Sequence, residues 1–322
     1  MFYVKEGERL KKVPFSKENP LPKNTVWLDM LNLTKLEETS VEDFLGISLP
    51  TREEMHEIEL SSSLYHENDA VYMTATIVTN ADTLEPESHA FTFILTGERL
   101  ITIRYCDPVP FQQFSAKAIT LSSQEQSAQA LFAGLLESIV ERIADILEKI
   151  GRDIDQMTQT IFRSSHHTQG KKRDYQKILE QIGREGDLVS KTRESLVTIN
   201  RMVGYALQSK TAKIKGEAHS KLDSLLRDVI ALSDHANFLS NKVGFLLDAT
   251  LGMINIEQNA IIKIFSVAAV VFLPPTLIAS IYGMNFDTMP ELRWSVGYPF
   301  AIALMIVSAI IPYLYFKRKK WL

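Results

Sequence analysis

The segment Ile264–Phe286, IFSVAAVVFLPPTLIASIYGMNF, contains no charged residue over its 23 positions. A second uncharged segment of 23 residues, Trp294–Phe316, WSVGYPFAIALMIVSAIIPYLYF, follows after a short loop. A helix of either length reaches roughly 35 Å, which exceeds the hydrocarbon thickness of about 30 Å in a typical bilayer. A core helix of a soluble protein rarely stays uncharged for six turns. The pair therefore predicts a transmembrane hairpin at the C-terminal end of the chain.

The charges that flank this hairpin predict its orientation. The connecting loop holds Asp287, Glu291 and Arg293, whereas the second segment is followed by the basic run KRKK at 317–320. Because basic residues concentrate in cytoplasmic loops, we expect the C-terminus in the cytoplasm and the short loop outside. Two spans return the chain to its starting side. The long N-terminal part is then cytoplasmic as well.

The composition of the chain excludes several classes of function. Of the 322 residues, 35 are basic and 39 acidic, and the net charge of −4 offers no basis for nucleic-acid binding. A single cysteine, Cys106, excludes an internal disulfide and a zinc site built from cysteines. We expect it in a strand, as a core residue. The sequence contains no H-E-x-x-H motif, P-loop or G-x-G-x-x-G motif. We therefore expect neither an enzyme nor an organic cofactor.

The region before the hairpin is predicted to be α+β. Residues 1–120 form an expected α/β domain, with strands at 26–28 and 70–78 and a hairpin of 91–95 with 100–105. Thr51 and Glu54 have the spacing of a capping box and predict a short helix through Glu59.

Long helices follow this domain. Residues 121–212 are expected to form an antiparallel hairpin of two long helices, and 213–286 a stalk helix that continues into the first span at about 264–286. The remaining parts are an extracytoplasmic loop at 287–293, the second span at 294–316 and a basic tail at 317–322.

The stalk has a heptad pattern. Nine of its ten core positions are apolar: Leu222, Leu225, Val229, Leu232, Ala236, Leu239, Val243, Leu246, Thr250 and Met253. This repeat predicts a packed, coiled-coil-like helix. So long a helix cannot bury itself alone, which favours assembly with copies of the same chain.

A narrow stripe of small and polar residues runs along the first span. Two seven-residue series define it: Asn259, Ser266, Leu273, Ser280 and Ile262, Ala269, Thr276, Gly283. Small residues allow two helices to approach closely, so the stripe is compatible with a helix–helix contact. It is also compatible with the wall of a water-filled pore, in which Leu273 and Ile262 would be the apolar constrictions. The residues alone leave both interpretations open.

Several motifs along the same region resemble the CorA family of magnesium channels. They are GMINIEQN at 252–259, FLPPT at 272–276, YGMNF at 282–286 and MPEL at 289–292, with a weaker patch, PTREEMHEIE, at 50–59. The strong resemblance covers about the last 70 residues of the chain. It favours the pore over the helix contact.

The resemblance implies a homopentamer in a bacterial inner membrane, whose first span lines one central pore. Gly283, Met284 and Asn285 would form the selectivity filter, with Asn285 holding hydrated Mg²⁺. The pore-lining residues would be Asn259, Ile262, Ser266, Ala269, Leu273, Thr276 and Ser280. Partners would be the lipid bilayer, divalent cations and copies of the same chain. The implied function is influx of Mg²⁺, and also of Co²⁺ and possibly Ni²⁺, down the electrochemical gradient.

Regulation is also implied by the resemblance. Mg²⁺ bound between the cytoplasmic parts of neighbouring subunits would close the channel, and Asp248 matches a family position at such a site. The partner carboxylate is not identified by any motif. Two alternatives remain beside the magnesium channel: a zinc transporter of the ZntB branch, and a membrane-anchored coiled-coil scaffold that conducts nothing.

Overall fold

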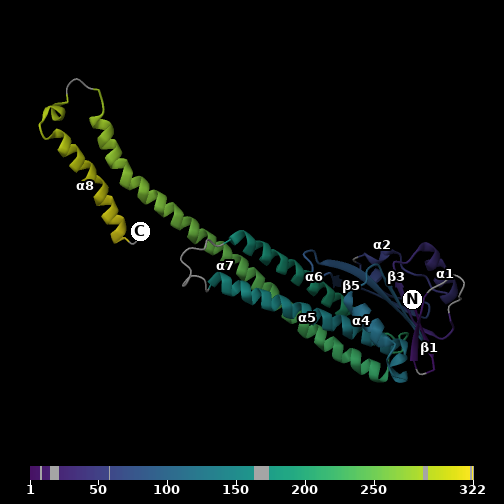
Figure 1. The fold of residues 1–322 in the computed structure, drawn as a ribbon. Helices are drawn as coiled ribbons and strands as arrows, with labels where there is room; N and C mark the ends of the chain where they lie inside the picture. Colours follow the sequence, from purple (N-terminus) through teal and green to yellow (C-terminus); the bar gives the residue numbers. More distant parts are fainter. Residues whose placement is uncertain are drawn as a thin grey trace. The chain divides into compact units, whose positions relative to one another are not determined.

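The structure is a computed structural model that describes residues 1–7, 9–14, 22–57, 59–162, 174–285, 289–319 and 321. Its internal contacts divide the chain into two units, Met1–Leu247 and Asp248–Leu322. Both units belong to an α+β chain with an N-terminal sheet, a long helix and two apolar helices near its end (Figure 1). These elements are the ones that the sequence predicts.

The first unit is built on one seven-stranded sheet with the order β2-β1-β3-β7-β6-β5-β4. Its strands are β1 (Phe2–Glu6), β2 (Arg9–Val13), β3 (Thr25–Leu31), β4 (Leu64–Glu67), β5 (Ala70–Thr79), β6 (Glu87–Thr96) and β7 (Leu100–Arg104). The pairing of β6 with β7 confirms the predicted hairpin. All pairs are antiparallel except β3 with β7, which are parallel and far apart in sequence.

Short helices cover one face of this sheet. They are α1 (Lys35–Leu45), α2 (Arg52–Met55) and α3 (Leu60–Ser63). Val41 of α1 and Met55 of α2 join a core cluster with Leu28, Ile94 and other sheet residues. The predicted capping box of Thr51 and Glu54 is present, but the helix ends at Met55 rather than at Glu59. His56 already donates its backbone N–H to the carbonyl of Glu53, a short-range bond that closes the helix after one turn.

Aromatic side chains of two other helices pack on the opposite face. These helices are α4 (Val109–Ala118) and α5 (Ala128–Phe162), which follows the 3₁₀ turn η1 (Ser123–Gln126). The ring of Phe132 in α5 lies 5.8 Å from that of Phe93 in β6, at a near-perpendicular angle. Phe114 of α4 lies 5.6 Å from Trp27 of β3. The sheet is thus covered on both faces by helices.

The short strand β4 pairs with only the first residues of β5. Beyond them, a helix binds the backbone groups at the outer edge of β5. The helix α6 (Tyr175–Gln208) supplies two hydroxyl groups for this purpose. Ser195 accepts the backbone N–H of Val78 at 2.8 Å. Thr198 accepts the N–H of Thr76 at 3.1 Å and donates to its carbonyl oxygen at 3.0 Å. Side-chain hydroxyls therefore replace the missing neighbouring strand.

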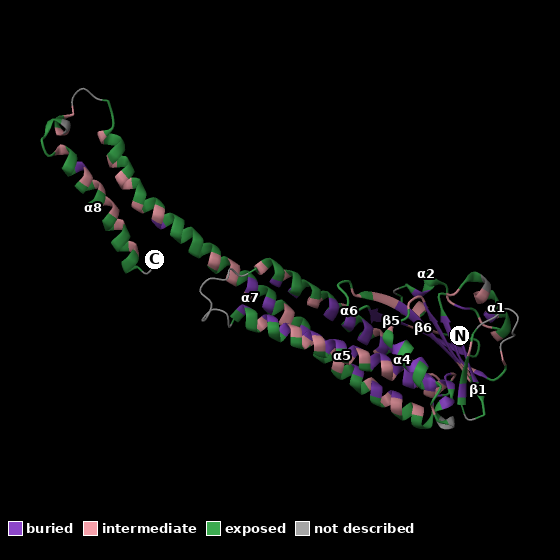
Figure 2. Ribbon diagram, viewed as in Figure 1, coloured by how far each residue is buried: buried purple, intermediate pink, exposed green. Residues whose placement is uncertain are grey.

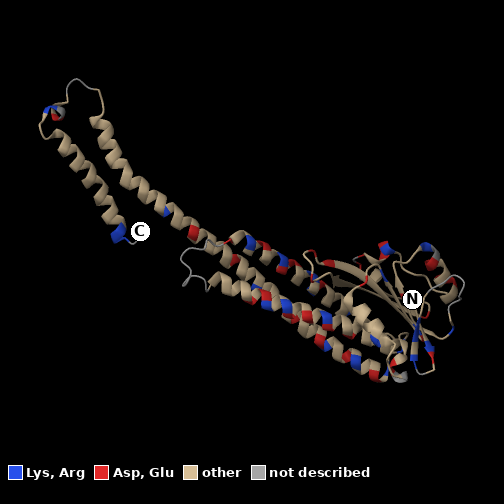
Figure 3. Cartoon of the chain, in the orientation of Figure 1, with Lys and Arg blue, Asp and Glu red and all other residues tan. Residues whose placement is uncertain are grey.

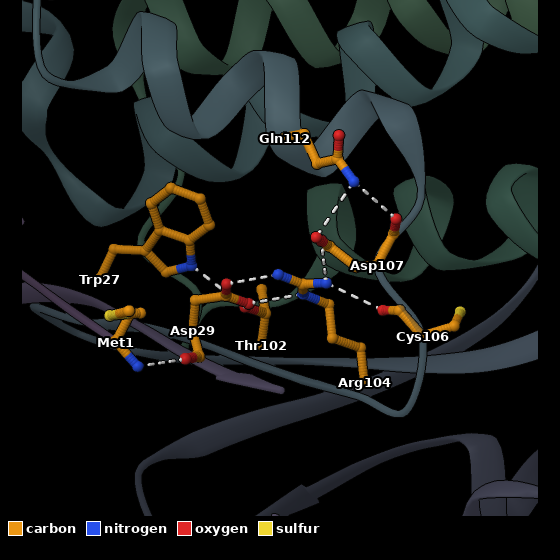
Figure 4. A network of polar contacts seen from close by, with 8 residues as sticks. All are labelled: Met1, Trp27, Asp29, Thr102, Arg104, Cys106, Asp107 and Gln112. Carbon is orange, nitrogen blue, oxygen red and sulfur yellow. Dashed lines mark hydrogen bonds and ion pairs between the residues drawn. The ribbon is translucent and has the colours of Figure 1, made fainter. Parts of the chain in front are cut away.

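A buried ion pair joins the two parallel strands (Figure 4). Arg104 of β7 donates to both carboxylate oxygens of Asp29 in β3, at 2.9 and 2.8 Å. Their side chains are only 5% and 4% exposed. Thr102 also donates to Asp29, and Asp107 accepts a third bond from Arg104. Because both charges are fully engaged, their desolvation is largely compensated.

Cys106 lies just after β7 and not in a strand as predicted. Its carbonyl oxygen accepts a hydrogen bond from Arg104, while its side chain is half-buried. Burial raises the pKa of the thiol to about 11. The thiol therefore stays protonated at neutral pH and is a poor nucleophile.

Three long helices follow the sheet: α5, α6 and α7 (Gly216–Tyr282). In the heptad repeat of α7 no position is exposed up to Met253, and Leu222, Val229 and Ala236 are fully buried. Lys221 of α7 pairs with Glu137 of α5 at 2.6 Å. Figure 2 shows the buried side of these helices in the first unit. The heptad face is therefore the face that α7 packs against its neighbours in the first unit.

The second unit contains the rest of α7, the 3₁₀ turn η3 (Pro290–Arg293) and α8 (Gly297–Arg318). By length and composition α7 and α8 are the two described helices that could cross a membrane. The helix α8 starts at Gly297, three residues after the first residue of the predicted span. A Cβ atom at Gly297 would collide with the carbonyl oxygen of Glu291, so only glycine permits this turn. That close approach sets the start of the helix.

Candidate ion pathway

The polar stripe of the first span lies on one continuous helix. From Asn259 to Ser280 the chain is α-helical without interruption, even at Pro274 and Pro275. At about 100° per residue, the eight stripe positions from Asn259 to Gly283 fall within an arc of about 120°. Their axial spread is about 36 Å, enough to span the hydrocarbon core of about 30 Å in a typical bilayer. The stripe can therefore line one side of a path across the membrane.

This arc is uncovered within the second unit. Each of its positions is exposed, including Ile262 at 60% and Leu273 at 65% (Figure 2). Amide and hydroxyl groups are costly when they face hydrocarbon. Asn259, Ser266 and Ser280 thus need water or another protein surface in front of them. The arrangement fits a helix whose polar side faces the axis of an assembly.

Thr276 and the two prolines form the centre of the stripe. Pro274 and Pro275 have no N–H to donate to the carbonyl groups four residues earlier, Val270 and Val271. Thr276 directs its hydroxyl to the carbonyl oxygen of Phe272 at 2.8 Å. Polar backbone groups are consequently available at mid-membrane depth, where they are tolerated only beside protein or water.

The predicted filter residues follow the last turn of α7. Gly283 donates its N–H to the carbonyl oxygen of Ala279 at 2.9 Å, and Met284 donates to Ile281 at 3.3 Å. A Cβ atom at Gly283 would lie 3.1 Å from the carbonyl oxygen of Ala279, which is a tight contact. Asn285 comes directly after this turn and is exposed. Its amide has no hydrogen-bond partner among the described residues, so it is free to contact a ligand.

The structure places Asp248 on an exposed position of α7, at the first residue of the second unit. Within the described part of the chain its carboxylate has no ion-pair partner, and no group of three or more metal-binding side chains is present. A metal ion at Asp248 would therefore need ligands from outside the single chain. The family resemblance suggests Asp248 for such a site and names no partner for it.

Aromatic and basic groups gather at the C-terminal end of α8. Figure 3 shows basic residues, in blue, at this end, after a helix without other charges. Lys319 lies 5.2 Å from the centre of the Tyr315 ring, and Lys263 of α7 lies 5.9 Å from that of Trp321. Such pairs are typical of a membrane–water interface. Lys320, part of the predicted basic run, lies outside the described residues.

Three comparisons bear on this geometry. The family described as CorA-like Mg²⁺ transporter protein matches residues 22–318 of the chain. The chain is 37% identical to the magnesium transport protein CorA of Escherichia coli strain K12 over 321 residues, which covers 98% of both proteins.

Solved structures support the same fold. The complete CorA magnesium transporter of Methanocaldococcus jannaschii has a TM-score of 0.77 at 19% identity, covering 96% of this chain and 95% of that one. The cytoplasmic domain of ZntB from Vibrio parahaemolyticus is more distant, with a TM-score of 0.53 at 10% identity, covering 71% of this chain and 87% of that one. The family's members are membrane transporters and not enzymes, in agreement with the two apolar helices. This chain belongs to the CorA-like Mg²⁺ transporter family.

Proposed function

We propose that five copies of this chain form a channel that admits Mg²⁺ to the cytoplasm through a central pore lined by α7. One observation carries this proposal: the polar arc of α7 is wholly exposed in the single chain and leads to the free amide of Asn285. The Escherichia coli relative, whose alignment covers 98% of this chain, is a magnesium transport protein. Co²⁺ and Ni²⁺ would use the same path, and α8 would pack outside the ring in the cell membrane, with both termini cytoplasmic.

The chemistry of Asn285 suits a hydrated ion. Mg²⁺ gives up its water slowly and prefers to keep several water molecules when it binds. A ring of neutral amide oxygens, with Gly283 and Met284 shaping the turn, can accept hydrogen bonds from those waters without removing them. Carboxylates at this place would hold the ion too strongly to release it. Below the ring, Leu273 and Ile262 would be the apolar constrictions of the closed pore.

The membrane potential is sufficient to drive entry. Moving two charges through roughly 100 mV yields about 4.6 kcal/mol, which corresponds to an accumulation on the order of a thousandfold. Accumulation on this scale requires a mechanism that closes the channel. We propose that Mg²⁺ closes it by binding between Asp248 of one copy and a group of the neighbouring copy. Asp248 is exposed and has no ion-pair partner among the described residues, which supports this role.

Ion flux into proteoliposomes under an inside-negative potential tests the proposal. We expect Mg²⁺ entry, and we expect Asn285→Ala to lose rate or selectivity against other divalent ions. Ser308→Ala is a matched control, because Ser308 lies on α8 and donates only to the carbonyl oxygen of Met305. Asp248→Asn should keep the filter intact while requiring more internal Mg²⁺ for closure.

Other outcomes would identify the alternatives. Zinc flux coupled to protons would place the protein with ZntB transporters. Absence of any divalent flux, with internal Mg²⁺ chelated so that feedback cannot close the pore, would leave the scaffold.

A further inference from the structure

The first unit contains a polar cavity that the ion pathway does not use. Its volume is about 550 Å³, within the range of small-molecule sites. The floor is formed by Thr74 and Thr76 of β5 and by Ser88 and Ala90 of β6. The end of α2 and one side of α6 form its walls. The whole cavity lies within Met1–Leu247 and so does not depend on the placement of the second unit.

Two arginines of α6 line this cavity, and neither is paired. Arg193 and Arg201 stand two helical turns apart on one face, about 12 Å along the axis, with Val197 between them. Neither guanidinium makes an ion pair or hydrogen bond to the described residues, although Glu194 is next to Arg193 in sequence.

Neighbouring cations in the same unit behave differently. Lys191, two residues before Arg193, binds Asp187 at 2.6 Å and the carbonyl oxygen of Pro86 at 2.8 Å. Lys242 pairs with Asp155, and Arg142 with Asp82. Two unpaired guanidinium groups line this cavity, whereas Arg184 is the one arginine among the described residues that line a second cavity along α6. An arginine is suited to bidentate binding of phosphate.

The remaining groups of the cavity supply hydrogen-bond acceptors and hydroxyls. Glu194 extends toward the hydroxyl of Ser88 at 3.5 Å, a long contact that leaves its carboxylate available. Glu57, which follows the end of α2, also lines the cavity. Carboxylates accept hydrogen bonds from hydroxyl or amino groups and repel a bare anion. The set thus favours a ligand that combines a phosphate with hydroxyl or amino donors.

We propose that this cavity binds a nucleoside phosphate, with its phosphate between Arg193 and Arg201 and its sugar or base donors on Glu57 and Glu194. The two arginines and the two carboxylates match the two kinds of group in such a molecule. The site is independent of ion conduction.

Calorimetry on the full-length protein in detergent tests the site. The probe is adenosine 5′-monophosphate, which complexes Mg²⁺ weakly, in buffer containing a chelator. We expect saturable binding to the wild type, and about tenfold weaker binding after Arg193→Ala or Arg201→Ala, since a charge-assisted hydrogen bond is lost. Val197→Trp, which fills the space between the arginines, should abolish binding while keeping both charges.

Two controls distinguish specific binding in this cavity from nonspecific electrostatic attraction of the nucleotide. Arg184→Ala removes an exposed arginine of the same helix outside this cavity and should leave the affinity unchanged. Inorganic phosphate and adenosine should each bind at least about tenfold more weakly than the nucleotide, because each satisfies only one half of the site. No binding of the nucleotide, equal binding of phosphate, or an equal effect of Arg184→Ala would overturn the proposal.

Discussion

The two units of this chain treat large apolar side chains in opposite ways. In the first unit Trp27, Phe93 and Phe132 are fully buried between sheet and helices. In the second unit Phe272 is 69% exposed and Ile311 is 62% exposed. The first unit therefore obtains its stability from contacts within the single chain. The second obtains it from the surroundings, which we propose to be lipid and four further copies.

The comparison extends to polar groups. The first unit compensates its buried charges internally, as Asp29 and Arg104 do. The second unit exposes Asn259 and Thr276 along a helix otherwise suited to lipid, and Asn285 after the end of that helix. The first unit should therefore be destabilised by substitutions in its interior. The effect of substitutions in the second unit should depend on the lipid or protein that surrounds it. The predictions below test this contrast.

We expect the largest loss of stability when the buried ion pair is broken. Asp29→Ala leaves Arg104 buried without its main partner and should lower the free energy of unfolding by about 3–5 kcal/mol. Urea unfolding of the detergent-solubilised protein measures this loss. Glu148→Ala is the control, because its pair with Arg152 is exposed and should contribute no more than about 1 kcal/mol. Equal losses in both variants would contradict the assignment.

The same truncation in the two units should have different costs. Ile139→Ala removes a side chain that is 1% exposed on α5 and should destabilise the protein by about 2–5 kcal/mol. Ile311→Ala removes an exposed side chain on α8 and should change stability by less than about 0.5 kcal/mol. Unfolding in detergent compares the two directly. A large loss for Ile311→Ala would show that α8 is covered by protein at that position.

A polar group of the stripe can be removed without changing its shape. Thr276→Val keeps the volume but deletes the hydroxyl, which is worth about 0.5–1.5 kcal/mol as a hydrogen-bonding group. We expect Mg²⁺ flux to fall by a factor of about 2–10 in proteoliposomes. Ser308→Ala on α8 again serves as the control. Unchanged flux in Thr276→Val would exclude its hydroxyl from the pathway.

The smallest effect concerns an exposed carboxylate at the β5–β6 turn. Hydrogen bonds from Lys149, and next from Arg142, lower the pKa of Asp82 below its ordinary value of 3.8. Its stabilising contribution is therefore present above that value and is lost as the pH falls through the lower folded pKa. Asp82→Asn should cost about 0.2–1 kcal/mol at pH 7. The difference from wild type should disappear in acid unfolding curves, and a constant difference would contradict this.

Local patterns predicted the elements that carry a regular period. The long helices and their heptad face followed from apolar spacing, and the β6–β7 hairpin from two β-rich runs around a four-residue turn. The exposed stripe and the position of Asn285 after the last turn of α7 were also readable, because glycine and asparagine mark a helix end. Each of these predictions depends only on residues that are close to one another in the sequence.

Other features have no local signal. The strand β2 consists of Arg9, Leu10, Lys11, Lys12 and Val13. Three of these five residues are basic, as is common on edge strands, so the segment lacks the apolar, β-branched composition by which strands are predicted. Asp29 and Arg104 are 75 residues apart and meet only because β3 and β7 are neighbours in the sheet. The cavity beside Arg193 likewise combines segments that are far apart in the sequence. Such features depend on the tertiary fold and not on any short pattern.

The hydroxyl groups that close the edge of β5 have a consequence for synthesis of the chain. Thr198 follows Thr76 by 122 residues. At translation rates of about 5–20 residues per second, β5 waits roughly 6–24 s before the helix that covers it exists. During that interval residues 74–79 of β5, which lie beyond its pairing with β4, have an unpaired edge. The nascent chain is therefore open to strand pairing with another polypeptide, and to chaperones, until α6 has left the ribosome.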